Sequence, residues 1–199
     1  MGRDDLPTLI VVSGPPATGK TTFATQLAGD LHLPCLSKDA VKEVIFDKLG
    51  WTDRAWSVRV GTAAVAIMLN LAERFLEAGC SCLVESNFRP AHMGPDFLTL
   101  QARTPFNPVQ VLCSCDGPTL VERFAARARS QDRHPGHVDA GNVAEFVPEL
   151  LVGSYEPLPL DGPVFNLDNT CFDPDAWQRL IEQVRVCLAK PRGRGRARL

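Results

Sequence analysis

The sequence predicts an α/β fold, in which helices cover both faces of a five-stranded parallel sheet. Short apolar, often β-branched runs alternate with segments of helical periodicity, and this alternation occurs five times along the chain. Strands separated in this way favour parallel pairing through right-handed crossovers. The 199 residues, 45% hydrophobic and 22% charged, suit one domain with a sizeable core. No linker divides them, so we expect a single domain over residues 1–189.

The first half of the chain supplies three strands. A β-branched run predicts the first strand, and apolar residues at helical spacing predict the helix after it. Gly50 ends the second helix, and Thr52 or Asp53 is the expected N-cap of the third, which Gly79 ends. In order, the predicted elements are Thr8–Ser13, Thr21–Leu31, Leu33–Ser37, Ala40–Leu49, Trp51–Ala78, Ser81–Val84 and, as a loop and helix, Pro90–Thr104.

The second half supplies two strands and three helices. Pro135 and Gly136 break the periodicity of a polar segment near residues 130–138, which we expect to be a loop that could move as a lid. His134 and His137 are interpreted as polar side chains of this loop rather than as metal ligands. The predicted elements are Val109–Ser114, Pro118–Ser130, Asn142–Val152, Val164–Asp168 and a last helix from Asp173 or Pro174 to about Ala189.

The loop after the first strand matches the phosphate-binding pattern G-x-x-x-x-G-K-[ST]. A strand before it and a helix after it make the match specific, although a chance match in a glycine-containing turn is the alternative. The glycines let successive N–H groups point at one anion, at the positive end of the new helix. Lys20 can reach the terminal phosphates, and the Thr21 hydroxyl suits Mg²⁺. We therefore predict a nucleoside triphosphate held by Gly14, Pro15, Ala17, Thr18, Gly19, Lys20, Thr21 and Thr22.

Polar residues that follow the other strands are the next candidates, because ligands of such sheets lie beyond the carboxyl ends of the strands. Asp39 follows the second strand, where a carboxylate could accept a hydroxyl proton; it could also cap the next helix. Lys38 either contacts a substrate anion or is simply exposed. Glu85 ends the third strand and could hold Mg²⁺, directly or through water, or orient an acceptor. A turn cap formed with Asn87 is the alternative.

Further candidates come from later in the chain. Arg89 could contact substrate. Arg123 and Arg127 share a helix face, and Arg133 follows in the loop. Guanidinium groups that close on a transferring phosphoryl group would neutralise its charge, whereas the alternative is an exposed basic helix face. Asp168 and Asn169, after the fifth strand, are placed where a nucleotide base could rest.

Cysteine usage and charge bear on the compartment and the partners. Seven cysteines and the lack of a signal peptide favour a reducing cytoplasm, and no apolar run is expected to span a membrane. Cys80-x-Cys82 and Cys113-x-Cys115 are interpreted as small buried thiols rather than as a zinc site. The chain has a net charge of −2. Residues 190–199 carry five basic side chains, so the rest of the chain has a net charge of −7. That tail could bind nucleic acid or be a solvated, disordered end.

These motifs resemble P-loop kinases of the group that includes zeta toxins, chloramphenicol phosphotransferase and the kinase domain of polynucleotide 5′-kinases, broadly AAA-type ATP-binding domains. The resemblance covers roughly residues 8–188. Only the phosphate-loop motif is highly specific; the others are Ser37-Lys38-Asp39, Val84-Glu85-Ser86-Asn87, and Glu122-Arg123 through Arg127 with the lid after it.

The resemblance implies strand order 2-3-1-4-5, ATP with Mg²⁺, and phosphoryl transfer to a hydroxyl group. It implies Asp39 as the acceptor's base, Arg127 and Arg133 as phosphate clamps, and Arg123 near the adenine. This chain has Lys38 where polynucleotide kinases usually have Arg, and Glu85 where many have Asp, which disfavours a nucleic-acid acceptor. We expect a kinase for a small hydroxyl compound; the alternatives are a 5′-hydroxyl nucleic-acid kinase and a nucleotide-switched binding module.

Overall fold

The sheet has five parallel strands in the order β2-β3-β1-β4-β5, which confirms the predicted fold class. The computed structural model describes residues 6–188, so the basic tail at 190–199 lies outside the described residues. The register pairs Val12 of β1 with both Glu85 of β3 and Val111 of β4, and pairs Ser37 of β2 with Glu85. The carboxyl ends of the central strands are therefore aligned at one edge. The strands are β1 (Thr8–Ser13), β2 (Cys35–Ser37), β3 (Cys82–Glu85), β4 (Asn107–Ser114) and β5 (Val164–Asp168).

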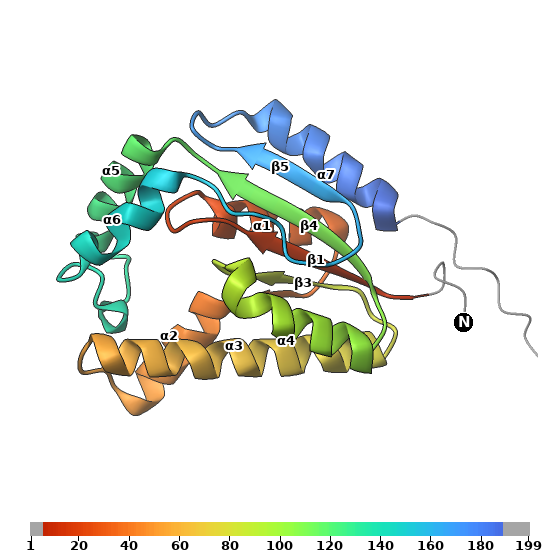
Figure 1. The fold of residues 1–199 in the computed structure, drawn as a ribbon, viewed down its shortest axis with the longest axis horizontal. Coiled ribbons are helices and arrows are strands. Elements are labelled where there is room, and N and C mark those ends of the chain that lie inside the picture. The colour runs from red at the N-terminus through yellow and green to blue at the C-terminus, as the bar shows by residue number, and fades with distance from the viewer. Residues whose placement is uncertain (1–5, 189–199) are drawn as a thin grey trace, which may run out of the picture.

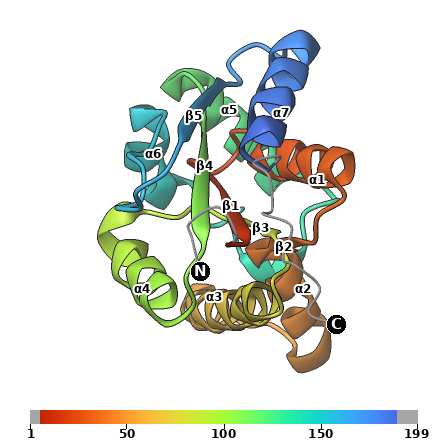
Figure 2. The ribbon, with the colours of Figure 1, turned by 90° about the vertical axis from the view of Figure 1, so that its right-hand side faces the viewer.

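Helices cover both faces of the sheet and extend past its carboxyl edge (Figure 1). Figure 2 shows α1 and α7 on one face and α3 and α4 on the other. The segment between α5 and α6 contains a short 3₁₀ turn, η2 (Pro135–His137). The helices are α1 (Lys20–Leu31), α2 (Lys38–Leu49), α3 (Arg54–Glu77), α4 (Pro90–Arg103), α5 (Gly117–Ala128), α6 (Val143–Val152) and α7 (Pro174–Leu188).

Two hydrophobic cores follow from the alternation of side chains along β1. Ile10 and Val12 point toward α1 and α7, whereas Leu9 and Val11 point toward α3 and α4. All four side chains are at most 1% exposed. A strand that is buried on both faces is expected to be a continuous apolar run, and the sequence of β1 has this pattern.

Several boundaries differ from the prediction for identifiable reasons. The helix after β2 begins at Lys38 rather than Ala40, with Ser37 at the N-cap position, so Asp39 lies in its first turn and does not cap it. The strand β4 begins two residues early and includes Pro108, and its pairing with β5 begins only at Gln110. Pro108 has no backbone N–H to donate, and it is tolerated here because it lies at the start of β4, before the pairing with β5 begins. The predicted N-cap Asp53 is confirmed, since its carboxylate accepts from the Trp56 amide.

Two other expectations are corrected. Cys82, Cys113 and Cys115 are buried, but Cys80 is exposed, because β3 begins only at Cys82. The helix α3 is long and apolar enough to cross a membrane, contrary to the expectation for the sequence. Only 28% of its most apolar window is buried within the protein. Length and composition alone are weak evidence for a membrane span, and the buried side of α3 packs on β1, β2 and β3.

Candidate active site

The phosphate-binding loop between β1 and α1 has the backbone of an anion cradle. Gly14 and Gly19 have φ angles of 149° and 80°, and Ala17 has φ 66°. A Cβ on Gly14 would lie 2.1 Å from the carbonyl oxygen of Cys113, so only glycine fits beside β4 there. The Thr18 hydroxyl donates to the Pro15 carbonyl at 2.9 Å, which closes the loop on itself. Alternating backbone conformations of this kind turn successive amides toward one point.

Two cations beside this loop have no carboxylate bound to them among the described residues. Lys20 is 8% exposed, and its Nζ donates to the carbonyl oxygen of Pro15 at 3.2 Å. Arg127, on α5, has its Nε buried without a hydrogen-bond partner. Burial lowers the pKa of both groups, with Glu85 acting against the shift in each case. Buried cations without a carboxylate partner are suited to bind an anionic ligand, which would accept their hydrogen bonds.

Asp39 lies at the start of α2, and its carboxylate faces two cations. Its oxygens are 3.0 Å from Nη1 of Arg133 and 3.5 Å from Nζ of Lys38. Burial acts to raise the pKa of Asp39, but the positive charges of Lys38 and Arg133 outweigh burial and hold it well below its usual range. Arg133 also donates to Asp139 at 2.8 Å, so one guanidinium joins the lid to the helix that carries Asp39.

The end of β3 completes the polar edge of the site. Glu85 is 2% exposed and accepts a hydrogen bond of 2.8 Å from the Ser37 hydroxyl at the end of β2. Asn87 accepts from Nζ of Lys38 at 3.0 Å. Glu85 and Asn87 therefore hold groups from β2 and α2 in place. Glu85 also lines the same cavity as the Thr21 hydroxyl, so this pair fits a hard cation with oxygen ligands.

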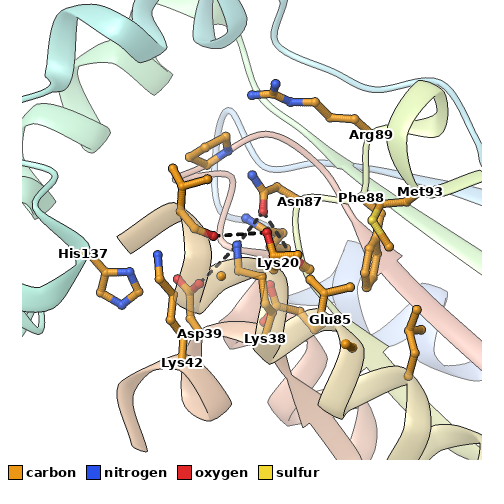
Figure 3. A pocket seen from close by; sticks show the side chains of 18 of the residues that line it. Lys20, Lys38, Asp39, Lys42, Glu85, Asn87, Phe88, Arg89, Met93 and His137 are labelled. Carbon is orange, nitrogen blue, oxygen red and sulfur yellow. Dashed lines mark hydrogen bonds and ion pairs between the residues drawn. The ribbon is translucent and has the colours of Figure 1, made fainter. Parts of the chain in front are cut away.

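A cavity of about 680 Å³ joins these groups (Figure 3). Its lining includes Lys20 and Thr21 at the phosphate loop, then Asp39, and continues between α3 and α4. Along α3 the lining residues run from Arg54 to Glu73, which at 1.5 Å per residue is roughly 28 Å. The cavity therefore offers space for a second ligand on the far side of Asp39 from the phosphate loop.

The lid at residues 130–138 packs onto α2 rather than extending into solvent. The His134 ring stacks on Phe46, with centroids 5.4 Å apart and an interplanar angle of 19°. A Cβ on Gly136 would lie 2.5 Å from a ring carbon of Phe46, so the turn needs glycine at this close approach. These contacts hold the segment against α2, and its Arg133 and His137 side chains line the cavity together with Asp39.

His137 is 2% exposed, which corrects the expectation of a polar loop histidine. Its Nε2 lies 2.8 Å from a Glu43 oxygen. A carboxylate partner would ordinarily favour the charged ring, but burial, together with Arg133, Lys42 and Lys38, lowers the pKa of His137 to about 3. The ring is therefore neutral, and because a carboxylate can only accept, Nε2 carries its hydrogen.

Three predicted site residues are bound elsewhere or lie outside the cavity lining. Arg123 donates to the backbone carbonyls of Asn169 and Thr170, at 2.8 and 2.9 Å, and does not line the cavity. Arg89 lines the cavity, but its guanidinium forms an ion pair with Glu149 of α6; Figure 3 shows it apart from the group around Asp39. Thr22 is exposed and outside the cavity lining.

Two polar side chains near the site have roles that sequence reasoning did not predict. Asn169 donates to the Thr18 carbonyl of the phosphate loop at 2.7 Å and accepts from the Trp177 indole at 2.8 Å. Its side chain therefore holds the loop and is not free to face a base. Lys42 lies one turn after Asp39 on α2, lines the cavity and donates to the Ser57 hydroxyl at 2.9 Å. Its spacing of three residues from Asp39 is a signal that the sequence did contain.

Comparison with known proteins is consistent with this geometry. The model of the AAA domain family matches residues 9–148, from β1 through the phosphate loop, Asp39 and the lid into α6. The chain belongs to this family. No curated protein matches the sequence. A crystal structure from Chloroflexus aurantiacus, provisionally described as a kinase, is 41% identical with a TM-score of 0.81, covering 91% of this AAA domain protein and 98% of its own chain.

More distant structures share the fold of the AAA domain protein. Chaetomium thermophilum Kti12, solved in complex with ADP-AlF3, is 18% identical with a TM-score of 0.62, covering 91% of this chain and 99% of its own. A sugar kinase from Janibacter is 12% identical with a TM-score of 0.54, covering 93% and 98%. The fold is thus that of a kinase-like P-loop domain.

Proposed function

We propose that this protein is an ATP-dependent phosphotransferase that moves the γ-phosphate to a hydroxyl group of a small molecule. One observation carries the proposal: a single cavity is lined by the phosphate-loop lysine and by the Asp39 carboxylate, and its lining continues along α3 and α4. A protein that only bound or hydrolysed a nucleotide would not need the second compartment. The 41% identical relative, described provisionally as a kinase, supports the same class.

ATP and Mg²⁺ fit the residues at the phosphate loop. Lys20 and Arg127 are cations without carboxylate partners among the described residues, and the buried Nε of Arg127 lacks any acceptor. Phosphate oxygens would supply the acceptors. The Thr21 hydroxyl and Glu85 would hold Mg²⁺, which in such sites neutralises phosphate charge.

Asp39 is the group that would receive the proton. As the acceptor oxygen bonds to the γ-phosphorus and the bridging P–O bond breaks, the hydroxyl proton passes to the Asp39 carboxylate and ADP leaves. In this structure Arg133 and Lys38 neutralise Asp39, and its lowered pKa makes it a weak base. We infer that Arg133 shifts toward the γ-phosphate during the reaction, which would free Asp39 and stabilise the phosphoryl group with the same cation.

The test is transfer of ³²P from γ-labelled ATP to hydroxylated antibiotics, sugars, nucleosides and 5′-hydroxyl oligonucleotides, with Asp39→Asn as the diagnostic variant. Loss of the proton acceptor should lower the transfer rate by about 10²- to 10⁴-fold and leave ATP affinity within a few fold. An Asp39→Asn variant that transfers at the parent's rate would sink the base assignment.

The same screen separates the other candidate functions. Transfer to oligonucleotides alone would favour the nucleic-acid kinase. A parent protein that phosphorylates no acceptor, yet changes its affinity for a partner when ATP binds, would be a nucleotide-switched module. The small-molecule class of the acceptor, the metal role of Glu85 and a cytoplasmic location are part of the proposal.

A further inference from the structure

Lys42 is a buried ammonium group in the wall of the cavity. It is 6% exposed, and its hydrogen-bond partner is the Ser57 hydroxyl at 2.9 Å. Its Nζ lies 5.3 Å from the centre of the Phe46 ring. Among residues 6–188 no carboxylate oxygen lies within 4.0 Å of it. An ammonium has three protons to donate, and Ser57 takes one of them.

The other cations of the cavity are accounted for. Lys38 bonds Asn87 and Asp39, while Lys20 and Arg127 face the phosphate loop, where ATP is proposed to bind. The arginines around the second compartment each have a carboxylate partner, the pairs being Arg54–Glu145, Arg89–Glu149, Arg103–Glu73 and Arg133–Asp39. Lys42 is thus the cation left over on the acceptor side of Asp39.

The surroundings of Lys42 belong to the cavity, because Lys42, Ser57 and Gly61 all line it. A Cβ on Gly61 would lie 3.7 Å from Nζ of Lys42, in ordinary van der Waals contact, so α3 approaches the ammonium closely at this point. The pKa of Lys42 is lowered to about 8, chiefly by burial and by Lys38. A buried cation in this condition gains most from an anion.

We propose that the acceptor is an anionic alcohol whose carboxylate or phosphate group binds Lys42 in the space beside Ser57 and Gly61, while its hydroxyl lies at Asp39. This inference depends on the proposed function and names its substrate class. Asp39 and Lys42 lie three residues apart on α2 and both line the cavity. We therefore expect the hydroxyl and the anionic group of the acceptor to be separated by a few bonds, as in a short hydroxy acid or a phosphorylated polyol.

A purely structural role for Lys42 is the competing explanation, because its bond to Ser57 joins α2 to α3. The two roles differ in their effect on stability. A buried ammonium kept for a ligand opposes folding, so Lys42→Met should unfold at the same temperature as the parent or a higher one. If Lys42 served to hold the helices together, Lys42→Met would unfold at a lower temperature. Ser57→Ala keeps the ammonium and removes the same helix-to-helix bond, together with the bond from the Ser57 hydroxyl to the His137 carbonyl, so it sets an upper limit on the loss expected from a structural role.

Calorimetry with inorganic phosphate or acetate tests the anion site directly. The phosphate loop is first saturated with a non-hydrolysable ATP analogue and Mg²⁺, so that the added anion reports on the second compartment. The parent should bind one anion, Lys42→Met should bind it at least tenfold more weakly, and Lys42→Arg should stay within about threefold. Whichever of phosphate and acetate binds more tightly identifies the group. A parent that binds neither, or equal binding by Lys42→Met, overturns the proposal.

A transfer assay keeps this inference separate from the proposed function. Each pair of acceptors compares an anionic with a neutral compound: glycerate against the near-isosteric glyceramide, and glycerol 3-phosphate against glycerol, which lacks the phosphate group. The parent should prefer the anionic member by more than tenfold in kcat/KM, and Lys42→Met should lose that preference. Preference for the neutral members refutes the anionic acceptor and leaves the kinase standing. Lys42-dependent anion binding with no transfer to any acceptor refutes the kinase and leaves the anion site.

Discussion

Asn169 joins three segments that are distant in the sequence. Its amide donates to Thr18 in the phosphate loop, and its side-chain oxygen accepts from Trp177 of α7. The residue is 5% exposed, so neither bond is readily replaced by water. The phosphate loop is therefore held from behind by β5 and α7, on the side away from the cavity.

Asn169→Ala should loosen the phosphate loop and thereby weaken ATP binding indirectly. Two buried partners would be left unpaired, which costs about 1–3 kcal/mol of folding free energy. We expect roughly fivefold weaker ATP binding, or about 1 kcal/mol. Denaturant unfolding and calorimetry measure the two effects.

The matched control is Asn169→Asp, which keeps an oxygen for the Trp177 indole and loses the donor to Thr18. It should show the binding defect as fully as Asn169→Ala. Wild-type ATP affinity in both variants would contradict the idea that the loop is positioned from behind.

At the scale of elements, the lid and α2 form one packed unit. Gly136 fits against Phe46 with no space for a methyl group. Gly136→Ala should therefore push the lid off α2, and overpacking of this kind costs about 1–3 kcal/mol. Thermal unfolding measures the loss. Gly141→Ala is the control, because a Cβ there meets nothing within 4 Å; equal melting temperatures for the two variants would argue against the packed lid.

His137 makes this unit sensitive to acid. Its pKa is about 3 in the folded protein against an ordinary value of 6.5, so the folded state binds fewer protons than the unfolded state between these values. Stability from this group is present above pH 6.5 and is lost as the pH falls toward 3, by roughly 4–5 kcal/mol in total. Glu43, whose pKa is raised, contributes in the opposite sense.

Unfolding measured between pH 4 and 7 should therefore show a smaller slope for His137→Gln than for the parent. Glutamine keeps a donor for Glu43 but does not titrate. Since every other acidic group is common to both proteins, the difference in slope isolates His137. Parallel curves would show that the ring titrates normally.

The sequence predicted the elements well and the packing between them less well. The phosphate loop is local, with its glycines, lysine and flanking strand within about twenty residues, so pattern alone identifies it. Lys42, Asn169 and His137 depend on partners 15 to 151 residues away. Such pairings depend on the position and rotation of each helix on the sheet, which hydrophobic periodicity does not specify. Arg123 shares a helix face with Arg127, yet bends toward the β5 loop and leaves the cavity.

For the whole molecule, Mg²⁺ and ATP should act as a thermal stabiliser. A ligand that binds only the folded state at about 100 times its Kd adds about 2.7 kcal/mol. For a chain of this size that raises Tm by roughly 5–10 °C. Scanning calorimetry should show one transition that moves as a unit, as a single domain over residues 1–189 requires.

The control for that experiment is ATP with a chelator, which removes the contribution of Thr21 and Glu85 to binding. Its Tm shift should be smaller than that of Mg²⁺ and ATP together. A shift confined to one of two separate transitions would contradict the single-domain prediction.

The stacking of His134 on Phe46 has a consequence for turnover. Phe46 lies on α2, the helix that also carries Asp39 and Lys42. The lid therefore packs on the same helix that supplies two polar residues of the cavity. If the proposed transfer takes place in this cavity and the product leaves past residues 130–138, its release would require the two rings to separate. We expect this separation to limit kcat. A smaller side chain at position 46 should then speed product release and leave the rate of the chemical step unchanged.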